Sequence, residues 1–131
     1  MYTGSIGNPV FEQGGAGGVI QLMEWDGTVT WEYVYSSTTY LQHHDVSMLP
    51  NGNILMLVWQ YKTKDEALKA GRIPSMIKEG ALWVDSVVEV RPTGSNTGEI
   101  VWEWHVWDHL VQSFSSDRDN YGIVLTDWLI I

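Results

Sequence analysis

Histidines are the residues of this sequence best suited to chemistry near neutral pH, and two of them are adjacent. His43 and His44 are followed at once by Asp45, at the head of a stretch that reads as a β-hairpin. Neutral imidazole can act as a base or nucleophile, imidazolium can hold an anion, and a carboxylate can orient and charge-stabilise an imidazole. We therefore take His43, His44 and Asp45 as candidate catalytic residues. The alternative is structural: a strand edge where polar side chains meet water.

Within this segment, His44 is the preferred candidate. Adjacent residues of a regular strand point to opposite faces, so His43 and His44 are not expected to face one site together. His44 directly precedes Asp45 at the start of the strand that leads into the turn at residues 49–53. We predict that His44 is the reactive histidine and that His43 and Asp45 surround it.

The other two histidines lie further along the chain. His109, in the segment Trp-Asp-His-Leu of residues 107–110, is expected in a loop after an aromatic strand. We predict that His109 and Trp107 contact a substrate, and the alternative for His109 is a structural hydrogen bond to Asp108 or to the backbone. His105 alternates within the aromatic strand, which favours a packing role.

A metal site would require three or four converging ligands. His43, His44, Asp45 and His109 could supply them only if the fold brought their two segments together. We therefore expect no metal and no cofactor.

Composition sets limits on the class of protein. The chain has 131 residues, of which 44% are hydrophobic, enough for one domain with a core. The formal net charge of -9 argues against a nucleic-acid partner, because such binding depends on clustered Lys and Arg. No apolar segment is long enough to span a bilayer, so no membrane partner is expected.

Eight tryptophans and two similar segments indicate repeated strands. Residues 19–35 and 85–107 each read as an alternating apolar strand, a turn, and a second strand with the pattern Gly-x-Val/Ile-x-Trp-Glu-aromatic. We expect Trp31, Trp102 and Trp104 to be core residues between sheets. A third hairpin lies between the two segments, and its Asn51-Gly52 pair predicts a type I′ turn.

Residues 62–80 interrupt the strand pattern. Thr63 and Glu66 fit a capping box, and Gly71 followed by Pro74 gives a stop, so we predict one short helix and a loop. Five of the seven basic residues of the chain lie here: Lys62, Lys64, Lys69, Arg72 and Lys78. They form either a solvated helix face or a positive lip that steers an anionic substrate.

The predicted fold class is all-β: a β-propeller fragment of about two to three antiparallel blades, with one short inserted helix. Residues 1–131 would form a single partial propeller domain, with residues 62–80 as the insertion, and a β-sandwich is the alternative. Because a ring usually needs about 4 to 8 blades, we expect either self-association or missing blades supplied by a longer chain.

Three segments carry a family resemblance: residues 43–57, residues 85–104 and the Trp-Asp-His-Leu of residues 107–110. Together they resemble the arylsulfotransferase family. The resemblance implies a six-bladed propeller in which a histidine at the central channel transfers a sulfuryl group from an aryl sulfate to a phenol without a nucleotide donor. A second hypothesis is a non-catalytic scaffold or interaction module, because the Gly-x-Val/Ile-x-Trp pattern is also similar to quinoprotein-type repeats.

Overall fold

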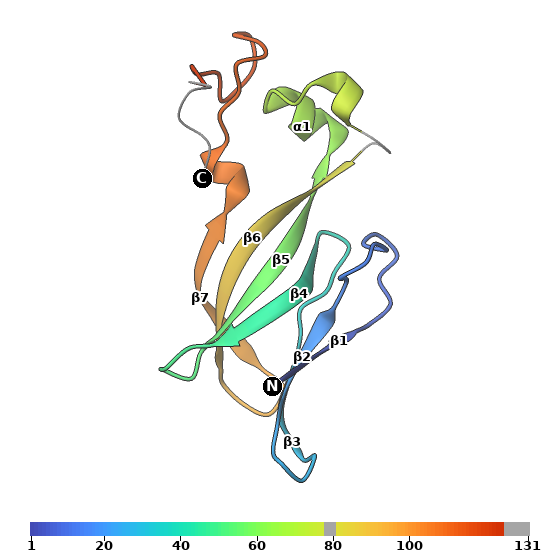
Figure 1. Ribbon diagram of the computed structural model, residues 1–131, viewed down its shortest axis with the longest axis vertical. Coiled ribbons are helices and arrows are strands. Elements are labelled where there is room, and N and C mark those ends of the chain that lie inside the picture. The colour runs from blue at the N-terminus through green and yellow to red at the C-terminus, as the bar shows by residue number, and fades with distance from the viewer. Residues whose placement is uncertain (78–80, 125–131) are drawn as a thin grey trace.

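The computed structural model describes residues 1–77 and 81–124, which form two antiparallel sheets (Figure 1). The three-stranded sheet is ordered β1 (Tyr2–Ser5), β2 (Gly18–Met23), β3 (Val29–Val34). The four-stranded sheet is ordered β4 (Tyr40–Met48), β5 (Ile54–Thr63), β6 (Ala81–Pro92), β7 (Gly98–His105). Three short helical segments complete the fold: α1 (Lys64–Lys69), η1 (Pro74–Met76) and η2 (Val106–His109). The all-β prediction is therefore confirmed.

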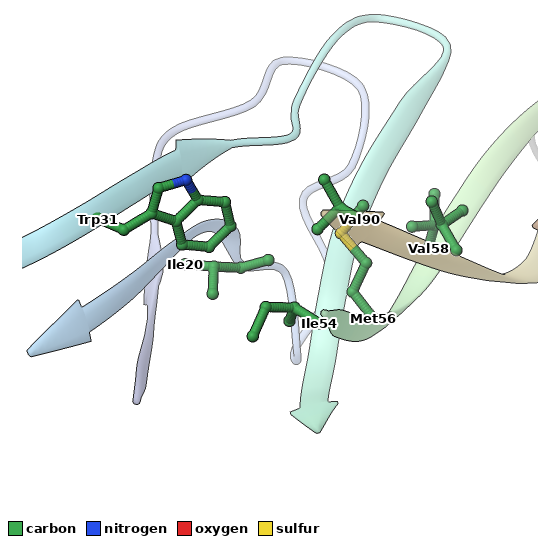
Figure 2. Packing of buried hydrophobic residues seen from close by; sticks show 7 residues of the cluster. Ile20, Trp31, Ile54, Met56, Val58 and Val90 are labelled. Atoms are coloured by element: carbon green, nitrogen blue, oxygen red, sulfur yellow. The ribbon is translucent and has the colours of Figure 1, made fainter. Parts of the chain in front are cut away.

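The core lies where the two sheets face each other (Figure 2). Ile20 and Trp31 come from the three-stranded sheet, and the other members come from the central strands β5 and β6: Ile54, Met56, Val58, Val88 and Val90. Alternate residues of β5 are buried, as a period of two predicts for a strand with one face on the core. The Trp31 indole also donates a hydrogen bond from Nε1 to the Thr97 carbonyl, 2.9 Å away, which ties β3 to the β6–β7 turn.

The β4–β5 turn differs from the type I′ prediction. Leu49 N–H donates to the Asn53 carbonyl at 2.8 Å, so the loop has three residues, and only Gly52 has a positive φ, at 83°. A type I′ turn would need a positive φ at Asn51 as well. Pro50 explains the difference, because its ring fixes φ near −65° and favours an ordinary type I turn followed by a left-handed glycine.

The two segments of similar sequence form the β2–β3 and β6–β7 hairpins. In each, the pairing slips by one residue just before the first tryptophan: Leu22 pairs with Trp31 and Met23 with Val29, while Glu89 pairs with Trp102 and Val90 with Ile100. Their tryptophans have different surroundings, however. Trp31 is 2% exposed, whereas Trp102 and Trp104 are 47% and 39% exposed. The expectation that Trp102 and Trp104 are core residues is wrong for this structure, because they pair with Glu89 and Val87 and so point to the face opposite the buried Val88 and Val90.

The predicted short helix is present as α1 (Lys64–Lys69). Thr63 is its N-cap, and the capping box is complete: Glu66 N–H donates to Thr63 Oγ1, and Thr63 N–H donates to the Glu66 carboxylate. Gly71 follows with a φ of 95°, a left-handed conformation that suits glycine at a helix end. The remainder of the predicted insertion contains η1, and its residues 78–80 lie outside the described residues.

Neither α1 nor any other helix in residues 1–77 and 81–124 has the length and apolar character needed to cross a membrane. The arrangement of the two sheets as blades of a propeller stays a prediction.

Candidate active site

His43 and His44 lie on a bulge in β4. His43 pairs with Leu57 and Val46 pairs with Met56, so two residues of β4 have no partner on β5 at this point. His44 has a φ of 51°, a conformation that is uncommon for residues other than glycine. The bulge brings both imidazoles together, with their Nδ1 atoms 2.8 Å apart. The expectation that a strand would separate them therefore fails, because the strand is not regular here.

His43 is buried and lies flat on Trp59. The two ring centroids are 4.2 Å apart with an interplanar angle of 11°. Trp59 belongs to β5, and the imidazole reaches over it to Asp85 on β6, so that His43 Nε2 lies 3.2 Å from Asp85 Oδ1. This contact falls short of hydrogen-bond geometry, and Nε2 has no other polar partner among the described residues. It is a close contact between a nitrogen of a buried imidazole and an exposed carboxylate.

Burial lowers the pKa of His43 below its ordinary value, and the neighbouring His44 lowers it further, although the Asp85 carboxylate opposes this shift. The desolvation of a buried imidazolium is therefore the dominant effect. His43 is consequently a neutral imidazole at neutral pH. A neutral imidazole can accept or donate one hydrogen bond at Nδ1, which is what the contact with His44 requires.

His44 is the exposed member of the pair. Its backbone N–H donates to the Gly15 carbonyl at 2.8 Å, which holds the bulge against the segment before β2. Gly15 has a φ of 94°, and a Cβ atom there would lie 2.2 Å from His44 Cε1. Only glycine leaves room for this ring position. With Nδ1 directed to His43, Nε2 is the nitrogen of His44 that remains for other chemistry.

Asp45 is exposed, and its Oδ1 accepts a hydrogen bond from the Val46 N–H at 2.8 Å. It therefore supports the backbone of the bulge. The carboxylate that lies against the histidine pair belongs to Asp85, which was not predicted from the sequence.

The other two histidines lie in different surroundings. His105 Nδ1 contacts Ser86 Oγ and Gln60 Nε2, and its Nε2 contacts Glu103 Oε2 at 2.7 Å, as expected for a packed, hydrogen-bonded residue. His109 is on η2, and its ring stacks on Trp104 with centroids 5.0 Å apart. No hydrogen bond or ring contact of the described residues joins His109 to His43 or His44.

Two open cavities flank the Trp59–Asp85 side of the pair. One, of about 570 Å³, is lined in part by Trp83, Asp85 and Trp107. The other, of about 790 Å³, is lined in part by Trp59 and Tyr61. Arg72 and Trp83 line both cavities. A guanidinium beside aromatic rings can bind an anion attached to an aromatic group. The Lys62 ammonium lies over the Trp107 ring, 4.9 Å from its centroid.

Metal binding would need a different arrangement. Within the described part of the chain, no group of three or more His, Asp or Glu side chains is placed to hold a metal ion. His43, His44, Asp45 and His109 therefore do not form such a group in this structure.

Three residues of this site were not predicted from the sequence: Trp59, Asp85 and Gly15. Trp59 and Asp85 are directly paired across β5 and β6, but they are 26 residues apart in sequence, so only the register brings them together. The one available signal was Asp85 itself, a charged residue within an apolar run. Gly15 lies in a glycine-rich segment that carries no other sign of a close approach.

These features define the chain as an all-β protein with a paired-histidine site at the edge of a sheet. The family model of arylsulfotransferase (ASST) matches residues 15–126. The chain therefore belongs to the arylsulfotransferase family, and the family supports a transferase function with aryl sulfates and phenols as substrates. No curated protein and no solved structure matches the chain.

Proposed function

We propose that the chain transfers a sulfuryl group from an aryl sulfate to a phenol, with His44 Nε2 as the nucleophile. The nitrogen lone pair forms an N–S bond as the S–O bond to the donor breaks, and the donor phenoxide leaves with the electron pair and takes a proton from water. The acceptor phenol then gives its proton to the hydroxide left by the first step, its oxygen forms the new S–O bond, and the N–S bond breaks with its electron pair returning to Nε2. The reaction thus consumes one aryl sulfate and one phenol and produces another of each.

The observation that carries this proposal is the imidazole pair. Nδ1 of the exposed His44 contacts Nδ1 of the buried, neutral His43, and this leaves Nε2 as the His44 nitrogen directed away from the pair. A nucleophile of this kind suits an anionic donor, since it brings no second negative charge to the sulfur. Neither cavity has His43 or His44 among its lining residues. Both are lined by Arg72 and Trp83 and lie next to Asp85 or Trp59, and we propose that they bind the sulfate oxygens and the aryl group of the donor.

Trapping the intermediate tests the proposal. Incubation of the purified chain with a chromogenic aryl sulfate, without an acceptor, should release about one phenol per chain and leave a labile sulfate on His44. Mass spectrometry of rapidly quenched peptides would locate it. An adduct on another residue, or turnover without an adduct, contradicts His44 as the nucleophile. If neither an adduct nor turnover occurs, the enzyme proposal is wrong and the non-catalytic scaffold becomes the better hypothesis.

We further propose that copies of this chain associate through the outer surface of the four-stranded sheet. Leu55, Leu57, Val87, Trp102 and Trp104 share this face, since cross-strand partners point the same way. Trp102 and Trp104 are exposed, and β7 is a sheet edge. Burial of apolar surface is favourable by about 25 cal/mol per Å², and an apolar edge strand favours pairing with another chain. A second copy would supply the next blade of the predicted propeller.

Light scattering on a size-exclusion column tests this association. At micromolar concentration we expect the native chain to elute with at least twice its mass of 14.9 kDa. Replacement of Trp102 by serine should shift it toward the monomer. The matched control is Trp25→Ser, because Trp25 is fully exposed on the β2–β3 turn and away from this surface. A native monomer that is active on aryl sulfates contradicts the association.

A further inference from the structure

Asp85, His43 and His44 lie in one line of contacts that begins at a carboxylate and ends at an exposed ring. Asp85 Oδ1 is 3.2 Å from His43 Nε2, and His43 Nδ1 is 2.8 Å from His44 Nδ1. We propose that Asp85 is a positioning residue that determines, through His43, which nitrogen of His44 carries the reactive lone pair. This inference rests on the proposed function and concerns a residue two strands away from the nucleophile.

The partners of each ring nitrogen determine where its hydrogen lies. The negative Asp85 carboxylate, 3.2 Å from His43 Nε2, is attracted to an N–H and repelled by a lone pair, so it favours the His43 tautomer whose hydrogen is on Nε2. Nδ1 of His43 then has a lone pair and no hydrogen. The 2.8 Å contact between the two Nδ1 atoms needs one hydrogen, and it must come from His44. His44 is therefore protonated on Nδ1, and the lone pair lies on Nε2, the nitrogen that is not occupied by His43.

The structure restricts the alternatives to this arrangement. The His43 ring is stacked on Trp59 with only 11° between the planes, and Ala16 forms a backbone bridge to His43 on the other side of β4. Within this plane, the contacts of Nε2 with Asp85 and of Nδ1 with His44 favour the present orientation over a flipped ring, which would place carbon atoms at both contacts. If Asp85 did not bias the tautomer, the hydrogen could lie on His43 Nδ1. His44 would then carry its own hydrogen on Nε2 and could not attack there.

Asp85→Asn is the direct test, because asparagine keeps the size of the side chain but removes the negative charge that faces His43 Nε2. The Asp85 side chain is 62% exposed, so the replacement should leave the fold intact. In the native chain at about pH 8, where imidazoles are neutral, ¹⁵N NMR should show His43 protonated on Nε2 and His44 on Nδ1. In Asp85→Asn the populations of both tautomers should shift toward the opposite nitrogens.

Kinetics gives a second readout. With an aryl sulfate donor, Asp85→Asn should lower kcat on the order of 10²-fold with little change in KM, and Asp85→Glu should recover part of the loss because it restores a carboxylate. Glu103→Gln is the matched control: it changes the carboxylate beside His105, on the same sheet, and should alter neither kcat nor the tautomers of His43 and His44.

The outcomes separate the two proposals. Unchanged His43 and His44 tautomers in Asp85→Asn would overturn the positioning role, even if the native chain transfers sulfate. If the chain neither transfers sulfate nor forms an adduct, but its tautomers and their shift are as predicted, the proposed function is rejected. The role of Asp85 in determining the His43 and His44 tautomers is then still supported. A loss of kcat in Glu103→Gln equal to that in Asp85→Asn would also overturn the inference.

Discussion

Replacement of His44 by alanine should lower the rate of sulfuryl transfer on the order of 10³-fold or more, because the variant lacks the nitrogen that forms the bond to sulfur. The effect should appear in kcat, and the release of one phenol per chain before turnover should disappear. The measurement is single-turnover kinetics with a chromogenic aryl sulfate. Because His44 is exposed, the circular dichroism spectrum should remain that of the native chain.

Two controls make this result specific. Free imidazole added to His44→Ala should restore part of the activity, since it can occupy the space left beside Gly15 and attack the donor in place of the side chain. His105→Gln removes an imidazole from the same sheet while it keeps hydrogen-bonding capacity toward Ser86, and it should retain transfer. If His44→Ala remained as active as the native chain, His44 would not be the nucleophile.

Replacement of Trp31 by alanine should reduce the free energy of unfolding by about 3–5 kcal/mol, the usual cost of removing a large buried aromatic side chain. Trp31 and Ile20 are the two residues of the three-stranded sheet in the buried cluster, whose other members come from β5 and β6 (Figure 2). The loss is a large part of the roughly 5–15 kcal/mol that stabilises an ordinary domain. Urea denaturation followed by circular dichroism measures it.

The comparison with other variants identifies the cause. Trp31→Phe retains most of the apolar contact but loses the hydrogen bond from Nε1 to the Thr97 carbonyl, so its effect should be smaller than that of alanine. Trp25→Ala removes an exposed tryptophan from a turn and should have almost no effect. Equal losses for Trp31→Ala and Trp25→Ala would contradict the assignment of Trp31 to the core.

Much of the local structure was predictable because its causes are local. The alternation of apolar residues predicted the strands, and Thr63 with Glu66 predicted the cap of α1. The exception is the β4–β5 turn, where Asn51-Gly52 was read as type I′ although Pro50 fixes an ordinary turn before Gly52. At this turn, the φ that the Pro50 ring fixes outweighed the preference of Asn51-Gly52 for a type I′ turn.

Burial was less predictable, since it depends on what covers a face. Trp31 and Trp102 follow the same sequence pattern and the same one-residue slip in pairing. Trp31 belongs to the cluster between the two sheets, while Trp102 points to the opposite face of the four-stranded sheet and remains 47% exposed. Equivalent sequence patterns thus give different burial in this chain.

The candidate site shows the same division. The sequence alone determined that His43 and His44 are the adjacent imidazoles, that they lie on a strand before a tight turn, and that the chain resembles the arylsulfotransferase family. Only the tertiary structure decided that a bulge turns both rings together, that Trp59 supports His43, and that Asp85 faces it. The physical reason is register: pairing across β4, β5 and β6 juxtaposes residues far apart in sequence, and the bulge, with His44 at a positive φ, frees that side chain from the regular alternation of a strand.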